Sequence, residues 1–595
     1  MKEFFTNRVS QFENRAYDLQ KRSNLYSYLR LFIFLSGSVA TFASFSHINE
    51  YPFFTIAPFA FLVSFVYLVL LHSRLKENKK NAAAMTQINK MYIKRAEGNW
   101  HEFKDEGKEF YSREHPYASD LDLYGFKSLY QFINTGRTFY GRKELRNFFE
   151  DPDSRPHTIR SRQDAVRELS QKLDFLQKIE CEGIDLNAET DLPARIKTLN
   201  KKYSEIVKDH MHFFYYTLPS LILFLLLLKI GFQKIPLFLP LGLILIQISY
   251  WIFGYGKITA VLSQIAAVRR DLTAYKKILL LIEKEEFNSE YLKKLKSNLK
   301  NSGYASKGIK NLEAIADRIN IRMSPLLQFL LNALFLFDYH AVISLKKWNK
   351  NYGEDIINWF SVIGSLEALS GYAVLHLIHP DWKFPEIIEN GPALFGKNVG
   401  HPLIPKSECI RNDLDFNGGV NIVTGSNMSG KTTFLRAIGL NLVLAYGGAP
   451  VCAEEFRCSV MTVHTSMRIS DDLSSGISTF YAELLRIKKI IEYSKTTNPM
   501  IYLIDELFRG TNSADRITGA KSVIHALSQE WTMGFISTHD HELSESREKI
   551  PVNNFHFKEE YSDNKILFDY KLRSGSCDSR NAVYLMRMLG IEVSE

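Results

Sequence analysis

Two short segments near the C-terminal end hold residue types that suit the chemistry of phosphate groups. Residues 425–432 read Gly-Ser-Asn-Met-Ser-Gly-Lys-Thr, after the apolar run 420–424 and before a helical pattern that continues to about Ala445. Glycines allow a tight turn, and backbone N–H groups at the start of the following helix attract an anion. Strand, loop and helix make up the P-loop pattern, in which Lys431 neutralises phosphates and the Thr432 hydroxyl binds Mg²⁺.

The second segment is an apolar run that ends in two carboxylates. Residues 501–504 read Ile-Tyr-Leu-Ile, which is typical of a buried parallel strand, and Asp505 and Glu506 follow directly. Phosphoryl transfer needs positioning and charge stabilisation above all. We therefore expect Asp505 to hold Mg²⁺ together with Thr432, and Glu506 to orient the attacking water. The alternative is a surface acidic pair that caps a helix.

A third predicted strand, residues 534–537, runs into Thr538 and His539. Lone histidines are usually structural. Here, however, His539 follows the carboxyl end of a parallel strand, which is the edge where such sheets bind nucleotides. The position predicts that His539 senses the γ-phosphate or positions the water.

Residues 471–480, between the first two strands, lead into a helix with Glu483 in its first turns. Small hydroxyl residues such as Ser478 at a helix N-terminus form an anion site. Taken alone, this segment is explained by a simple N-cap.

The length indicates several domains, and the uneven spread of apolar residues along the chain indicates a membrane protein. The chain has 595 residues, of which 46% are hydrophobic and 23% charged, with a formal net charge of +9. This charge is compatible with a nucleic acid or with an anionic membrane surface. The cysteines form no CxxC pair, which disfavours a structural zinc site and a secreted disulfide scaffold. They are Cys181, Cys409, Cys452, Cys458 and Cys577.

Two pairs of apolar stretches predict two membrane hairpins. The first pair covers residues 31–45 and 53–71, and the second covers about 213–228 and 235–253. Each stretch is near the ~20 residues that cross a bilayer. Lysines and arginines flank the first pair and are absent from its connecting segment, so the positive-inside rule places both flanks in the cytosol. Buried core helices of a soluble protein are the alternative.

The order of four segments resembles the ATPase domain of the MutS mismatch-repair family. Residues 400–402 and 411–413 also resemble the family's approach to the first ATPase strand, and the strong similarity covers about 395–590. A fainter similarity to the family's helical core covers much of 115–380, where 359–372 resembles the lever helix. The four segments are residues 425–432, 471–480, 505–515 and 537–543.

The resemblance implies an α/β P-loop NTPase domain of the ABC and MutS type, which takes ATP with Mg²⁺ and works as a homodimer. Ser478 matches the residue that reaches the nucleotide of the opposite subunit, and residues 509–512 match the dimer seam. Glu506, Lys431 and His539 are then catalytic, and Thr432 and Asp505 hold Mg²⁺. The remaining expected nucleotide-binding residues, besides Ser478 in trans, are Gly425, Ser426, Asn427, Met428, Ser429, Gly430, Lys431, Thr432 and Thr433.

The full prediction adds a helical core and lever region and about four transmembrane helices to this domain. Residues 278–282 and 326–337 are apolar but short or interrupted, so we expect them to pack within a helical bundle. The predicted parts are a cytosolic segment 1–25, hairpin 26–72, helical region 73–210 with a MutS core-like part from about 115, hairpin 211–256, core and lever 257–380, and ATPase domain 381–595.

Four departures from the family bear on function. No Phe-x-Glu mismatch reader is recognisable, Ile477 stands where the family commonly has Arg, and Arg516 stands where Gly is usual. The fourth departure is the pair of hairpins. These differences weaken the case for lesion recognition and leave the ATP chemistry intact.

Two functions follow. The first is a multi-pass ATPase of the inner cell membrane, with its ATPase domain in the cytoplasm, that couples ATP turnover to DNA binding, and the DNA part rests on the resemblance alone. The second is an ATP-driven membrane switch that acts on a protein partner. Half of an ABC transporter fits less well, because four spans in two distant hairpins make a poor translocation pathway.

Overall fold

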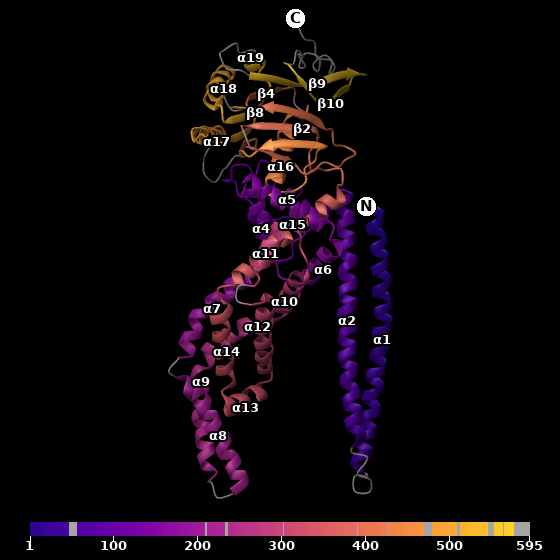
Figure 1. Cartoon of the computed structure of the whole chain (residues 1–595), viewed down its shortest axis with the longest axis vertical. Helices are drawn as coiled ribbons and strands as arrows, with labels where there is room; N and C mark the ends of the chain where they lie inside the picture. The colour runs from indigo at the N-terminus through magenta and orange to yellow at the C-terminus, as the bar shows by residue number, and fades with distance from the viewer. Residues whose placement is uncertain are drawn as a thin grey trace. The chain divides into compact units, whose positions relative to one another are not determined.

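The structure is a computed structural model of the chain (Figure 1). It describes residues 1–46, 56–208, 211–232, 236–300, 303–389, 391–426, 428–468, 479–508, 512–544, 552–562 and 565–575. The chain divides into two units, residues 1–100 with 173–184, and residues 101–172 with 185–595.

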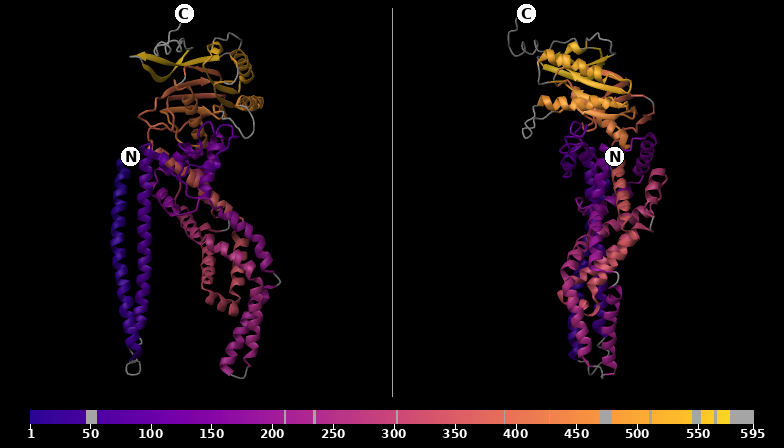
Figure 2. Two further views of the ribbon diagram at one scale, coloured as in Figure 1. Left: turned by 180° about the vertical axis from the view of Figure 1, so that it is seen from behind. Right: turned by 90° about the vertical axis from the view of Figure 1, so that its left-hand side faces the viewer.

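The first unit is a long helical hairpin with one short helix. Its α-helices are α1 (Lys2–Ser46), α2 (Ile56–Ala96) and α6 (Leu173–Gly183). α1 and α2 run side by side along their length (Figures 1 and 2). At 1.5 Å per residue, each is about 60 Å long, roughly twice the hydrocarbon thickness of a bilayer. The apolar stretches predicted from the sequence therefore form less than half of each helix.

The other, charged half of this hairpin packs on α6. Phe5, Ile88 and Tyr92 are buried in this half, and the Tyr92 hydroxyl donates to Glu180 Oε2 at 2.9 Å. The polar half thus has a folded neighbour, while the apolar half has none among the described residues of this unit.

The second unit combines a helical region with two β-sheets. Its α-helices are α3 (Leu129–Ile133), α4 (Phe139–Glu150), α5 (Pro156–Ser170), α7 (Leu192–Ile206), α8 (His212–Phe232), α9 (Phe238–Ala267), α10 (Arg269–Lys284), α11 (Glu290–Ser297), α12 (Ala305–Ile319), α13 (Pro325–Phe335), α14 (Phe337–Tyr352), α15 (Ile356–Ile378), α16 (Lys431–Gly447), α17 (Thr479–Ser494), α18 (Ser513–Leu527) and α19 (His541–Ser544). Its strands are β1 (Glu386–Ile388), β2 (Ala393–Val399), β3 (Asn412–Asn417), β4 (Gly419–Thr424), β5 (Glu455–Ser459), β6 (Thr462–Ser466), β7 (Met500–Asp505), β8 (Thr532–Thr538), β9 (Val552–Ser562) and β10 (Lys565–Ser574).

The second predicted hairpin is formed by α8 and α9, and buried polar groups join α9 to α13 and α14. Gln247 Nε2 donates to Asn332 O at 3.0 Å. Trp251 Nε1 donates to Asp338 Oδ2 at 3.0 Å, and the Arg322 guanidinium lies 3.0 Å from Asp338 Oδ1. These contacts fix α9 to the turn between α13 and α14.

Residues 326–337 pack against the neighbouring helices α8, α9 and α14, but along one face of α13 only. Leu336 ends this helix in the left-handed conformation, with a φ of 48°, and α13 and α14 are bent by 79° at this break. The bend leaves only one face of α13 packed. Its other face presents Leu326, Leu327, Phe329 and Leu330, which are 45–69% exposed. The patch 278–282, in contrast, lies in α10 with Ile278 and Leu279 fully buried, as predicted.

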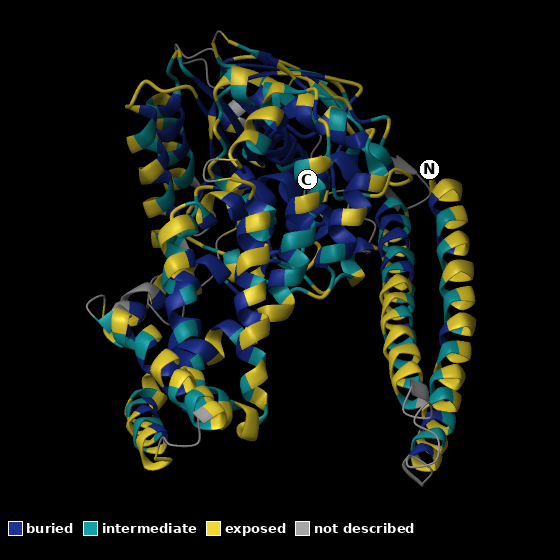
Figure 3. Ribbon diagram, turned by 60° about the horizontal axis from the view of Figure 1, so that its bottom comes forward, coloured by how far each residue is buried: buried dark blue, intermediate teal, exposed yellow. Residues whose placement is uncertain are grey.

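Five helices of the described residues are long and apolar enough to cross a membrane, but their surroundings differ. They are α1, α2, α8, α9 and α15. In the apolar window of α15, 83% of the residues are buried, against 6% in α1 and α2, 22% in α8 and 17% in α9. Figure 3 shows exposed residues along the hairpin that begins at the N-terminus. α15 is therefore a core helix, whereas the apolar surfaces of the two hairpins are uncovered.

α15 packs against α4 at two glycines. A Cβ atom on Gly364 would lie 2.6 Å from Tyr140 O, and one on Gly141 would collide with the Glu367 carboxylate. Glu367 Oε2 accepts a hydrogen bond from Thr138 Oγ1 at 2.6 Å. Burial raises the pKa of Glu367 to about 7, although its hydrogen bonds act in the opposite direction.

The C-terminal part contains a six-stranded and a four-stranded sheet (Figure 1). The larger sheet has the order β10-β9-β4-β8-β7-β6, in which β10 is antiparallel to β9 and the other neighbours are parallel. The smaller sheet has the order β1-β5-β2-β3. Parallel neighbours need crossover connections, which α16, α17 and α18 supply. β7 is buried along its whole length, which explains its unbroken apolar sequence.

Candidate functional site

Three neighbouring strands of the larger sheet end at the predicted phosphate-binding residues. β4, β8 and β7 lie next to one another and are parallel, with Thr424 opposite Thr538 and Asp505 opposite Ser537. Their carboxyl ends therefore share one edge of the sheet, which is where ligands bind in such folds. Strand pairing thus brings together side chains that lie far apart in the sequence.

The loop between β4 and α16 has the geometry of a P-loop. Gly425 and Gly430 have φ angles of 150° and 102°, and a Cβ atom on Gly430 would lie 3.0 Å from the Tyr570 ring. α16 begins at Lys431, so its first N–H groups and the positive end of its dipole face the loop. Lys431 Nζ donates to Gly425 O at 2.9 Å and to Ser426 O at 2.8 Å, which holds the ammonium group across the loop.

The two predicted magnesium ligands meet. Thr432 Oγ1 donates to Asp505 Oδ2 at 2.7 Å, and Ser537 Oγ donates to Asp505 Oδ1. A hydroxyl and a carboxylate are the hard oxygen donors that Mg²⁺ prefers. Ser429 Oγ is buried and has no hydrogen-bond partner among the described residues, so the loop also keeps a polar group to offer. The donor set fits a Mg²⁺ ion that is brought in with phosphate groups.

Glu506 and His539 form a second contact beside Lys431. His539 Nε2 lies 2.8 Å from Glu506 Oε1 and 3.3 Å from Lys431 Nζ. Because a carboxylate only accepts hydrogen bonds, the shorter contact requires the proton on Nε2. Glu506 has a φ of 55°, which is uncommon for a residue with a side chain, and its N–H donates to Ser537 O at 3.0 Å. Backbone strain of this kind is concentrated at functional sites.

Arg516, the residue that stands where the resembled family has Gly, is paired next to this contact. Its Nε and Nη2 each lie 2.8 Å from the Asp540 carboxylate, in the two-point geometry that arginine makes with carboxylates. Hydrogen bonding to Asp540 raises the pKa of Arg516, and the charge of Glu506 acts in the same direction. Since Asp540 follows His539, the pair ties α18 to the segment that carries His539.

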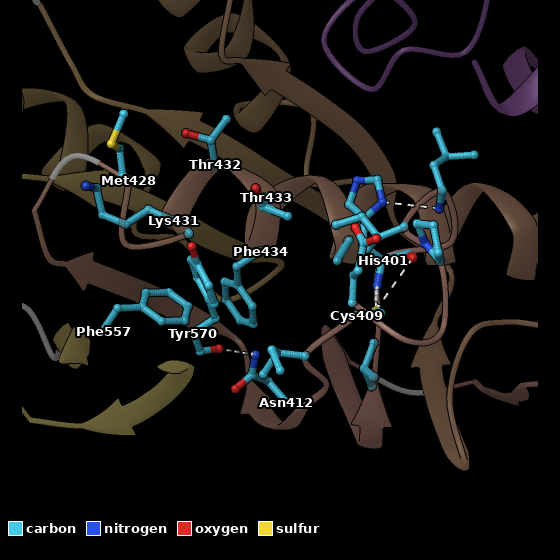
Figure 4. Close-up of a pocket in the computed structure, with 18 of the residues that line it drawn as sticks. His401, Cys409, Asn412, Met428, Lys431, Thr432, Thr433, Phe434, Phe557 and Tyr570 are labelled. Carbon is cyan, nitrogen blue, oxygen red and sulfur yellow. Dashed lines mark hydrogen bonds between the residues drawn. The ribbon is translucent and has the colours of Figure 1, made fainter. Parts of the chain in front are cut away.

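A cavity of about 580 Å³ opens beside the P-loop (Figure 4). In Figure 4, Lys431 and Thr432 lie toward one end and His401 and Cys409 toward the other, and the Tyr570 ring lies beside Lys431. Cavities of this size with an aromatic wall and a few polar groups hold small ligands. One end of the cavity suits phosphate groups, and the rest suits a flat ring system.

The structure brings most of the predicted site residues together. Those that line the cavity are Ser426, Met428, Gly430, Lys431, Thr432, Thr433 and Glu506. Asp505 and His539 contact lining residues through Thr432 and Glu506. Asn427, Ser478 and residues 509–511, which were predicted for the nucleotide site and the dimer seam, lie outside the described residues.

Sequence reasoning assigned no role at this site to Glu559, Glu483, Tyr570 or Ser537. Glu559 Oε1 accepts the N–H of Ser426 at 3.2 Å, and the buried Glu483 accepts the N–H of Phe508 at 2.5 Å. Tyr570 reaches the P-loop because the β9–β10 hairpin pairs with β4 through β9, and no local motif signals that long-range pairing. Ser537 could have been found, because it lies opposite Asp505 once β8 and β7 are taken as neighbours.

Comparisons with known proteins agree with this geometry. Residues 421–594 match the family model of MutS domain V. The chain is 29% identical over 266 residues to the DNA mismatch repair protein MutS of Caldicellulosiruptor saccharolyticus, which covers 43% of this chain and 30% of that protein. It is 31% identical over 243 residues to MutS of Caldicellulosiruptor bescii, covering 39% and 28%. It is 30% identical over 237 residues to the DNA mismatch repair protein MutS 2 of Halobacterium salinarum, covering 38% and 27%.

The aligned region spans less than a third of the length of each of these relatives. The C-terminal part of the chain is therefore similar to domain V of MutS, a domain of the P-loop ATPase type.

Proposed function

We propose that the chain is a membrane-anchored, MutS-like ATPase that binds and hydrolyses Mg-ATP as a homodimer. One observation carries the ATPase part: Thr432 meets Asp505 at 2.7 Å and Glu506 meets His539 at 2.8 Å, both beside Lys431. Phosphoryl transfer needs groups that position the reactants and stabilise charge, and a pair of magnesium ligands next to a carboxylate and a cation supplies them. The match to MutS domain V supports the same assignment.

Each side chain has a separate task in this proposal. Lys431 exchanges its two carbonyl partners for the β- and γ-phosphates, where it stabilises developing charge. Thr432 and Asp505 hold the Mg²⁺ that arrives with ATP. Glu506 accepts a hydrogen bond from the attacking water and directs it at the γ-phosphate, while His539 donates from Nε2 and fixes the Glu506 carboxylate.

The homodimer is proposed because Ser478 matches a residue that completes the nucleotide site of the opposite subunit. Exposed apolar side chains support an interface in this region. Met428 in the P-loop is 83% exposed, and Tyr481, two residues into α17, is 53% exposed. Apolar surface next to a phosphate-binding loop is well suited to burial by a second copy.

The membrane anchor is proposed for α1, α2, α8 and α9. Their apolar windows are 6–22% buried, so exposed apolar surface runs over lengths that match a bilayer. The charged flanks of the first hairpin support a cytoplasmic position for both chain ends of that hairpin. Since an even number of spans returns the chain to the starting side, the ATPase domain is placed in the cytoplasm, beneath the inner cell membrane.

ATP turnover by the purified, detergent-solubilised chain tests the ATPase part. With Mg²⁺, the protein is expected to hydrolyse ATP, and Lys431→Ala is expected to abolish binding. Glu506→Gln should keep ATP binding and lower the turnover rate by about 10²-fold or more, as for loss of a general base. The matched control is Glu455→Gln, since Glu455 is an exposed carboxylate on β5. Hydrolysis by Glu506→Gln at the rate of the control would reject the assignment.

What the ATPase drives is proposed from two sources. The relatives are named DNA mismatch repair proteins, which favours coupling to DNA. ATPase rates with duplex, mismatched and branched DNA at two salt concentrations test this, because phosphate contacts make DNA binding salt-dependent. Unchanged rates and no binding at low salt would remove DNA from the proposal.

The uncovered hairpins favour the second candidate, an ATP-driven switch that acts on a protein partner in the membrane. Glu506→Gln, held with ATP, is expected to enrich such a partner from solubilised membranes relative to Lys431→Ala. Equal recovery of every protein by the two variants would count against the switch.

A further inference from the structure

Two cysteines from separate segments meet at the end of the cavity farthest from the P-loop. Cys409 lies in the loop between β2 and β3, and Cys452 lies between α16 and β5. A Cβ atom on Gly400 would lie 2.8 Å from Cys409 Sγ and 3.0 Å from Cys452 Sγ, so the two sulfurs crowd the same Cα atom. Since both sulfurs lie within 3.0 Å of that one position, the two thiols are neighbours. The absence of a side chain at Gly400 is what lets the sulfurs approach each other.

The surroundings give the two thiols different chemistry. Cys409 is half-buried and lines the cavity, and its sulfur accepts the His401 N–H at 3.3 Å. The hydrogen bond from Cys452 lowers the pKa of Cys409, and the His401 amide and the Arg411 charge act in the same direction. Cys452 is buried, and the same hydrogen bond together with burial raises its pKa. Cys409 is therefore the accessible nucleophile, and Cys452 is the buried partner.

A metal does not explain the pair. Among the described residues, no group of three or more His, Cys, Asp and Glu side chains could hold a metal ion. The imidazole of His401 accepts the Leu403 N–H on Nδ1 at 3.2 Å and so stabilises the local turn. The pair is therefore interpreted through the chemistry of two thiols.

The pair also links the cavity wall to the helix that follows the P-loop. Asn441 of α16 is fully buried, accepts the Cys452 N–H at 2.8 Å, and donates to Gly400 O at 2.9 Å. On the other side, Cys409 N donates to Pro405 O at 3.0 Å within the loop that lines the cavity. A bond between the sulfurs would join this loop to a segment fixed on α16.

We propose that Cys409 and Cys452 form a reversible disulfide that reshapes the far end of the cavity and weakens ATP binding. The effect on ATP rests on the proposed function, whereas disulfide formation does not.

The oxidant is a low-molecular-weight disulfide such as oxidised glutathione. Cys409 thiolate attacks one sulfur of the oxidant, forms a mixed disulfide and releases one thiolate. Cys452 then gives its proton to water and attacks Cys409 Sγ, which forms the protein disulfide and releases the second thiolate. Both released thiolates take up protons as their pKa dictates, so two protein thiols are oxidised and one disulfide is reduced to two thiols.

Loss of affinity follows from disulfide geometry. A disulfide requires a sulfur separation of about 2.05 Å and a fixed torsion, which two separate thiols do not have. Cys452 is held by Asn441, so Cys409 and its loop move, and the His401 N–H loses its acceptor. Disulfides of reducing compartments are typically transient and sensory, which agrees with a pair in which one thiol is half-buried and lines a ligand cavity.

The test uses the solubilised full-length chain after treatment with oxidised glutathione or with dithiothreitol. Mass spectrometry of non-reduced peptides is expected to find Cys409 linked to Cys452 in the oxidised sample. A fluorescent ATP analogue is expected to bind at least 5-fold more weakly to that sample, with recovery after dithiothreitol. Cys452→Ser should form no internal disulfide and instead keep a glutathione adduct on Cys409, and when reduced it should bind the analogue like the parent. Cys458→Ser, which alters a buried cysteine on β5, is the matched control and should oxidise like the parent.

Peptides without the Cys409–Cys452 link would overturn the proposed site. A link that forms without any change in analogue binding would overturn the regulatory effect. If the link forms and the reduced protein binds no analogue, the effect on ATP is rejected together with the proposed function, and the disulfide site stands.

Discussion

α15 and the hairpin helices are built from similarly apolar sequences, yet their surroundings are opposite. All of them pass the same test of length and apolarity, but the window of α15 is 83% buried and those of α1 and α2 are 6% buried. α15 contains Gly364 and Gly371, whose Cβ atoms would lie 2.6 Å from Tyr140 O and 2.9 Å from Ile133 O. Small residues therefore let other segments approach α15. In α8, residues 221–228 are all Leu, Ile or Phe and include no glycine.

The difference teaches that apolarity alone does not separate a core helix from a candidate span. The buried polar residues carry the additional information, because each buried polar group needs a partner. Glu367 illustrates this, since its carboxylate is buried in α15 and accepts a hydrogen bond from Thr138.

The largest expected effect comes from a charge inside α15. Leu366 is 2% exposed, so Leu366→Arg buries an unpaired guanidinium and should destabilise the fold by more than about 4 kcal/mol. We expect little soluble protein after detergent extraction and a strongly lowered thermal midpoint. Ile357→Arg is the control, because Ile357 is on the same helix and 38% exposed. A midpoint for Leu366→Arg equal to that of the control would show that α15 is not a core helix.

The second hairpin resembles α15 in having a buried carboxylate packed against it, since Asp338 of α14 accepts a hydrogen bond from Trp251 of α9. Asp338 is fully buried and pairs with Arg322, so Asp338→Leu leaves a buried cation unpaired and is expected to cost about 3–5 kcal/mol of stability. Thermal unfolding of the solubilised protein measures this. The double variant Arg322→Leu/Asp338→Leu should recover much of the loss, because no lone charge remains. Equal losses in the single and double variants would show that the pair is not coupled.

The nucleotide site was predicted from sequence far better than the packing of the helices outside the ATPase domain. The P-loop and the Asp505–Glu506 pair are local patterns whose strand and helix context can be read along the chain. Tyr570 was missed because its place beside the P-loop depends on the non-local pairing of β9 with β4, which brings the β9–β10 hairpin to the site. The bend at Leu336 was missed because a left-handed leucine has no sequence signal, so the exposed apolar face of α13 was taken for a packed one. The contact of Cys409 with Cys452 depends on folding around Gly400, which spacing does not reveal.

The α15 core is also expected to respond to pH through Glu367. Its pKa of about 7 in the folded chain exceeds the ordinary 4.5, so the folded state favours the protonated form. Stability is then fully present below about pH 4.5 and is lost as pH rises to about 7, by roughly 3 kcal/mol in total. Urea unfolding at a series of pH values measures this slope. Glu367→Gln should remove it, whereas Glu354→Gln, at an exposed position, should keep it. A slope that survives in Glu367→Gln would assign the pH dependence to another group.

The smallest effect is expected for a charge on the uncovered surface of the first hairpin. Leu62 on α2 is 59% exposed, so Leu62→Arg creates no buried charge within the protein and should leave the thermal midpoint in detergent unchanged. In a bilayer the same change should raise the free energy of insertion by about 2.5 kcal/mol. The readout is labelling of Asn49→Cys, in the segment that joins α1 and α2, by a membrane-impermeant maleimide added outside intact cells. Labelling should fall in Leu62→Arg and persist in Leu62→Ala. If the arginine variant is labelled as strongly as the alanine variant, the exposed side of α2 does not face lipid, and the contrast with α15 has to be explained by a protein partner instead.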